Sequence, residues 1–152
     1  MGLAARIVSS WSFAARRLAR LAQIAGASER LAGSLKRHAT LCAYTNIKSG
    51  LEALAIAEAA DAQALRDLLL PYQVWPAPAR SHQRAGGSNW ARLSDDLAAE
   101  VAMVRALNAA IANWEGPDHA IADRLRAIVT AKATSLDRLR ALTLRCDPQA
   151  LD

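Results

Sequence analysis

Residue types that build β-sheets, disulfide frameworks and membrane spans are scarce in this chain of 152 residues. Aromatic residues make up 5% of the sequence, and the β-branched residues are scattered instead of alternating as strands require. The two cysteines, Cys42 and Cys146, form no CxxC motif, and this pattern indicates reduced thiols in a cytoplasmic protein. No apolar run approaches the ~20 residues that cross a bilayer.

Sequence motifs of the common enzyme classes are also missing. Gly86-Gly87 is not followed by the Gly-Lys-Ser/Thr of a phosphate-binding loop, and no Gly-x-Ser-x-Gly elbow occurs. The sequence therefore favours a protein that is not an enzyme, and it points to no organic cofactor.

Alanine, leucine and arginine dominate the composition, and these residues lose little side-chain freedom in a helix. Apolar residues recur every three or four positions and are interrupted by glycine and proline. We predict an all-α fold, a single-domain antiparallel bundle of four to five helices over residues 1–152. The predicted helices cover residues 3–24, 29–44, 51–70, 90–114 and 119–146.

Two breaks in the first half of the chain are predicted from local signals. Gly26-Ala27-Ser28 combines a helix-ending glycine with a capping serine. Ser49 and Glu52 fit a capping box beside Gly50, so we favour a break there over one helix across residues 29–70. Further on, Asp118 is expected to cap the last helix after a tight turn at Gly116-Pro117.

A proline- and glycine-rich segment at about 71–88 excludes regular structure. Long loops of this kind often carry function, although a tryptophan in such a loop more often anchors it to the protein. Its polar and aromatic residues are a candidate ligand or partner site: Tyr72, Trp75, Arg80, His82 and Arg84.

Three acids interrupt two otherwise apolar seams. Glu58 and Asp61 lie in the seam that runs from Ile47 to Leu68, and Glu100 lies in the seam of the next helix. A carboxylate that faces a core must be paired, protonated or bound to a metal. We therefore consider either an ion pair, with the candidate cations Arg105, Arg124 and Arg138, or a metal or small-ligand site. The layout resembles that of ferritin-like di-iron proteins, but their Glu-x-x-His motifs are missing here.

The first 27 residues form a basic amphipathic segment that could be peripheral to a bundle body over residues 28–152. Residues 1–40 hold a net charge of +6, which leaves −1 for the remainder. This segment can pack on its own bundle, bind a protein partner or an anionic membrane, or target the chain to the mitochondrial matrix. The candidate surface residues are Trp11, Phe13, Arg16, Arg17, Leu18 and Arg20.

The hypothesis we favour is a non-enzymatic bundle that acts by protein–protein association, with a partner protein or with itself. The first alternative is a bundle that binds a metal or small ligand through Glu58 and Glu100, and the second is association with a membrane surface. Nucleic-acid binding through Lys36, Arg37 and His38, together with the N-terminal arginines, is disfavoured because the remainder of the chain is nearly neutral.

Overall fold

The computed structural model describes residues 3–76 and 87–146, with side chains from residue 12 onward. All regular elements in these ranges are helical, so the prediction of an all-α fold is confirmed. The elements are α1 (Leu3–Leu41), α2 (Thr45–Leu69), the short 3-10 helix η1 (Leu70–Tyr72), α3 (Asn89–Trp114) and α4 (His119–Arg145).

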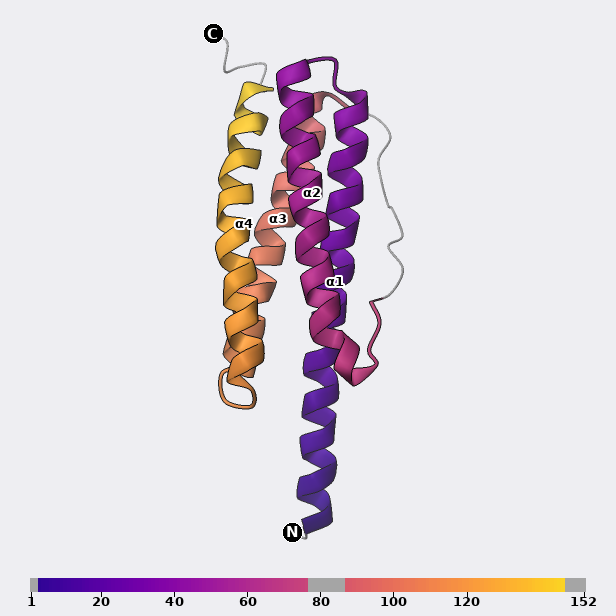
Figure 1. The fold of residues 1–152 in the computed structure, drawn as a ribbon, viewed down its shortest axis with the longest axis vertical. Coiled ribbons are helices and arrows are strands. Elements are labelled where there is room, and N and C mark those ends of the chain that lie inside the picture. Colours follow the sequence, from indigo (N-terminus) through magenta and orange to yellow (C-terminus); the bar gives the residue numbers. More distant parts are fainter. Residues whose placement is uncertain (1–2, 77–86, 147–152) are drawn as a thin grey trace.

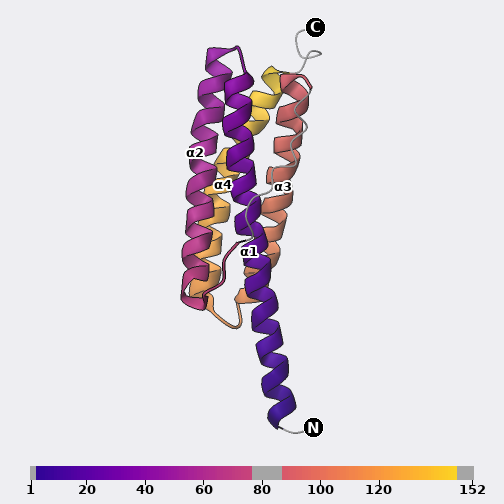
Figure 2. The ribbon, with the colours of Figure 1, turned by 90° about the vertical axis from the view of Figure 1, so that its right-hand side faces the viewer.

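The four long helices lie side by side, and each helix runs antiparallel to its two neighbours (Figures 1 and 2). α1 and α2 form one hairpin, and α3 and α4 form a second. α1 packs on α3 and α2 packs on α4, while α2 and α3 lie diagonally and run in the same direction. Because α2 ends at one end of the molecule and α3 begins at the other, a long connection is required between them. The chain between η1 and α3 makes this connection. The irregular segment expected at about 71–88 begins instead with the 3-10 turn of η1, and residues 77–86 lie outside the described part of the chain.

The core between the helices is built mainly from leucine. Leucines at helical spacing bury their side chains along the whole length of the bundle. This arrangement removes their apolar surface from water, which stabilises the fold. Those exposed by 1% or less are Leu21, Leu35, Leu51, Leu65, Leu69, Leu93, Leu107 and Leu125.

The ends of α3 and α4 follow local sequence signals. The Ser88 hydroxyl accepts a hydrogen bond from the Ala91 amide at the start of α3. The Asp118 carboxylate accepts from the amides of Ala120 and Ile121, which confirms the predicted cap of α4. These groups satisfy amides that have no partner within the helix.

The predicted break at Gly26-Ala27-Ser28 is wrong, because α1 continues through these residues. The Ser28 hydroxyl does not cap a helix. It donates to the backbone carbonyl and the carboxylate of Glu58 on α2, and Ser28 is fully buried. The small side chains thus lie inside the α1–α2 contact, where tertiary packing outweighs a local stop signal.

The predicted break near Gly50 is also wrong, since the turn lies earlier, at residues 42–44. Ser49 is inside α2, where its hydroxyl donates to the Thr45 carbonyl. A Cβ atom at Gly50 would lie 3.0 Å from Cδ1 of Leu142 on α4. Glycine therefore serves close packing between α2 and α4 at this position, and the turn forms elsewhere.

The continuity of α1 can be tested at Gly33, which is exposed and where an added Cβ would meet no neighbouring atom within 4 Å. Gly33→Ala should raise the free energy of unfolding by about 0.5–1 kcal/mol, because alanine loses less backbone freedom in a helix. Gly50→Ala is the matched control. Its free energy of unfolding should rise less, because the new methyl group presses on Leu142. Urea unfolding measures both, and a loss of stability in Gly33→Ala would contradict a continuous α1.

Candidate functional site

A cluster of buried charges lies midway along the bundle and draws a residue from every helix. Ser28 comes from α1, Glu58 and Asp61 from α2, Glu100 from α3 and Lys132 from α4. Lys132 is completely buried, and Glu58 and Glu100 are each 1% exposed. All three groups are therefore removed from water, so each charge depends on the other groups of the cluster for compensation.

The Lys132 ammonium is the centre of this cluster. It donates to both carboxylate oxygens of Glu58, at 2.7 and 2.6 Å, and to those of Glu100, at 3.4 and 3.2 Å. Asp61 lies 3.5 Å away and is half-buried. The Ser28 hydroxyl completes the network by donating to Oε2 of Glu58 at 3.1 Å.

The surroundings raise the pKa values of Glu100, Asp61 and Lys132. Burial, followed by the charge of Glu58, raises the pKa of Glu100 from 4.5 to about 7, although Lys132 opposes this change. Burial also raises the pKa of Asp61. Burial alone would lower the pKa of Lys132, but the carboxylates of Glu58 and Glu100 outweigh it and raise this pKa.

A second buried polar group joins α1 to α3. Asp96 is buried and lies 2.5 Å from Nδ1 of His38, and it accepts a hydrogen bond of 2.6 Å from the Ser34 hydroxyl. In a hydrolase triad the serine bonds to the histidine, whereas Ser34 bonds to the carboxylate. This group therefore lacks the arrangement that activates a nucleophile. Burial of His38 also removes it from the proposed phosphate-binding set with Lys36 and Arg37, which are exposed.

The structure brings together the three acids that interrupted the predicted seams. Their partner is Lys132, whereas the candidate cations Arg105, Arg124 and Arg138 all lie on the exposed surface. Sequence reasoning missed Lys132, although the sequence held the signal. The apolar seam of α4 is interrupted near its middle by a charged residue, in the same way as the seams of α2 and α3. This seam reads Ile121, Leu125, Ile128, Lys132, Ser135, Leu139 and Leu142.

The cluster has the chemistry of a proton site more than that of a metal site. Within residues 3–76 and 87–146, no three His, Cys, Asp or Glu residues are arranged to hold a metal ion. The ammonium of Lys132 occupies the position between Glu58 and Glu100 that a cation would need. The donor set therefore does not fit a metal while Lys132 is charged, but two adjacent carboxyl groups can share a proton.

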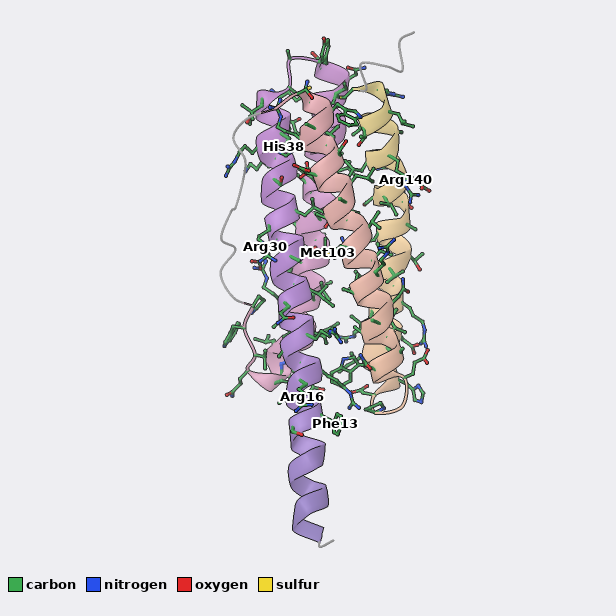
Figure 3. All side chains as sticks on the ribbon, turned by 180° about the vertical axis from the view of Figure 1, so that it is seen from behind. Phe13, Arg16, Arg30, His38, Met103 and Arg140 are labelled. Atoms are coloured by element: carbon green, nitrogen blue, oxygen red, sulfur yellow. The ribbon has the colours of Figure 1, made fainter. Side chains whose placement is uncertain are left out.

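Two of the predicted surface residues of the N-terminal segment, Phe13 and Arg16, lie near the end of the bundle from which α1 projects (Figure 3). Phe13 is 55% exposed, and the Arg16 guanidinium lies over its ring. Arg17 lies over the ring of Trp114, and Leu18 packs against the core. Arg20 is exposed, and the side chain of Trp11 lies outside the described residues. No helix in the described part of the chain has the length and apolarity to cross a membrane.

The predicted loop site is described only at its start. Tyr72 and Trp75 are both exposed, whereas Val74 packs against the core. Trp75, at 68% exposure, is thus not the residue that anchors this segment. Arg80, His82 and Arg84 lie outside the described residues.

Comparisons with protein-family models, with curated protein sequences and with solved structures gave no match.

Removal of the central cation should destabilise the protein strongly. Lys132→Met leaves two buried carboxylates without a counter-charge, and we expect it to lower the free energy of unfolding by about 3–5 kcal/mol at neutral pH. Urea unfolding measures the loss. If the cause is the unpaired charge, the triple variant Lys132→Met, Glu58→Leu, Glu100→Leu should recover most of it. A triple variant no more stable than Lys132→Met would contradict this explanation.

The raised pKa of Glu100 predicts how stability depends on pH. The folded state binds this proton more tightly than the unfolded state, so the stabilisation is complete below pH 4.5 and is lost as the pH rises through about 7. Glu100→Gln removes the titration. The stability of the natural protein relative to Glu100→Gln should thus fall by about 3 kcal/mol across this range. Unfolding with urea at a series of pH values tests this, and the exposed control Glu115→Gln should leave the dependence unchanged.

Proposed function

We propose that this protein is a non-enzymatic four-helix bundle that binds a partner protein through the N-terminal projection, defined here as residues 3–16 of α1. The observation that carries the proposal is that α1 extends well past the ends of the other three long helices (Figures 1 and 2). A helical segment that extends past its neighbouring helices gains little from packing, so a partner that covers it would supply further contacts.

The place where α1 leaves the bundle is defined by its contact with α3. Arg17 lies over Trp114, the last residue of α3. Every described side chain before it, from residue 12 to residue 16, is exposed. At 1.5 Å per residue, the N-terminal projection continues for about 21 Å beyond this point.

The apolar stripe of α1 continues along the N-terminal projection. Leu21 is fully buried, and Leu18 packs against the core. Positions 3, 7, 11 and 14 hold Leu, Ile, Trp and Ala, and by helical register they prolong the same stripe. Within the bundle α1 packs on α2 and α3. A partner helix that packs on the continued stripe would take the place of these two helices beyond their ends.

A second exposed apolar surface lies in and just after η1. Leu70, Tyr72 and Trp75, in and after η1, are 54%, 43% and 68% exposed. Figure 1 places η1 at the end of the bundle from which α1 projects. The two surfaces together give a partner both a helix to pack on and exposed aromatic rings, which are common anchors in interfaces.

Charge identifies the class of partner. Residues 1–20 contain Arg6, Arg16, Arg17 and Arg20 and no acidic residue. A partner whose apolar groove has an acidic rim complements this segment and is steered towards it. A second copy of this chain that packs stripe to stripe would place arginine beside arginine, and a flat membrane along the stripe would collide with the ends of α2 and α3. We therefore favour an acidic helical protein.

A photo-crosslinking amino acid at Ala14, which is exposed on the stripe, tests the proposal in the cells that produce the protein. The same group at Ala133, exposed on α4, is the control. We expect an adduct at Ala14 alone, with a protein that holds an acidic amphipathic segment. Once the crosslinked partner is purified, the double variant Arg16→Glu/Arg20→Glu should bind it at least about tenfold more weakly than the natural chain, or by ~1.4 kcal/mol. High salt should weaken it further.

Three outcomes would contradict this function. Arg138→Glu changes an exposed residue far from the N-terminal projection, so an equal loss of binding in this variant would show that the segment has no special role. A crosslink between two copies of the chain would identify self-association instead. Co-sedimentation with phosphatidylserine-containing vesicles that requires residues 3–16 would identify a membrane surface.

A further inference from the structure

Two buried polar contacts cross the seam between the helical hairpins α1–α2 and α3–α4. On one side Lys132 of α4 bonds to Glu58 of α2. On the other side Asp96 of α3 bonds to His38 and Ser34 of α1. The chain passes from the first hairpin to the second once, in the segment between η1 and α3. The seam is therefore held by buried charges as well as by leucines.

The other ion pairs of the described residues stay within one hairpin and lie nearer to solvent. Arg66 pairs with Glu29 between α2 and α1, and Arg126 pairs with Glu115 and Asp123 in the second hairpin. Exposed pairs of this kind add little stability, whereas a buried charge without its partner is strongly destabilising. The state of charge at the seam therefore matters more than any of these surface pairs.

The central cluster has more acids than its single cation can neutralise. Lys132 is its one cation, and Glu58, Glu100 and Asp61 surround it. With all three carboxyl groups ionised, the cluster would hold a net charge of −2 in an apolar interior. The carboxyl groups of Glu58 and Glu100 meet at the same ammonium, with oxygens 2.6 and 3.2 Å from Nζ of Lys132. A proton shared between them removes one negative charge and adds a hydrogen bond.

We propose that Glu58 and Glu100 form a proton-binding site beside Lys132, and that loss of this proton loosens the seam between the two hairpins. The site takes up one proton from solvent and releases it again, with no other reactant. When the proton leaves, two adjacent carboxylates compete for one ammonium, and their repulsion acts across the seam because Glu58 belongs to α2 and Glu100 to α3.

The groups that surround the Glu58–Glu100 site come from α1, α2 and α4 and change how readily it holds a proton. α2 supplies Asp61, which adds negative charge, and α4 supplies Lys132, which favours ionisation. α1 supplies only the neutral hydroxyl of Ser28, which donates to Glu58. Because burial outweighs the single ammonium, the pKa of Glu100 lies near 7. The site thus changes its charge near neutral pH, where a small change in proton concentration alters its occupancy.

Carbon-13 NMR of the glutamate carboxyl groups tests the proton site in the natural protein. We expect one carboxyl resonance to titrate with a midpoint near pH 7 and to disappear in Glu100→Gln. The exposed control Glu115→Gln should retain it. If every glutamate titrates in its ordinary range, near pH 4.5, the proposal is overturned. This measurement uses the natural protein, so it does not depend on whether a variant folds.

Spin-label distances test the second half of the proposal, the loosening of the seam. Labels at the exposed positions Ala53 on α2 and Ala141 on α4 report across the seam, and labels at Ala109 and Ala127 report within the α3–α4 hairpin. Above pH 8 the first pair should show a longer, broader distance distribution than near pH 6, and the second pair should not change. Glu100→Gln should abolish the difference. Identical distributions for the first pair at both pH values would overturn the loosening.

Discussion

The contact between the Lys132 ammonium and the carboxylates of Glu58 and Glu100 is the constraint on which the packing of this protein depends. A buried charge tolerates little displacement from its partners, because no water is present to replace them. Leucine seams can slide past one another by a turn and remain apolar, but only one register brings these three residues together. The cluster therefore sets how α2, α3 and α4 align, and the hydroxyl of Ser28 extends the network to α1.

The same cluster links the packing of the bundle to its two proposed activities. α1 keeps its position through leucine packing, through Ser28 and through the contact of Ser34 and His38 with Asp96. α1 continues without a break from these contacts to the N-terminal projection. The proposed binding through the N-terminal projection requires only that α1 is held in this way. Proton release at the seam is a separate property, since it acts between hairpins and far from the projection.

The incorrect helix breaks show the limit of local signals. Glycine beside serine is a common stop and start signal for helices, and Gly26 and Gly50 both have a serine nearby. In the folded protein Ser28 and Gly50 lie at contacts between helices, where small residues allow close approach. The cost of glycine in a helix is about 1 kcal/mol, which burial of the surrounding leucines readily exceeds. A local pattern cannot distinguish a turn from a close contact between helices.

The sequence by itself determined the all-α class, the positions of α3 and α4, the Asp118 cap and the presence of acids in the seams of α2 and α3. These features depend on periodicity and on neighbouring residues, and both can be read along the chain. Only the tertiary structure decided which cation meets the acids and that His38 pairs with Asp96. It also decided that α1 extends past its neighbours. The physical reason is that partners 58 or 74 positions apart are selected by how whole helices pack, and no local pattern records this selection.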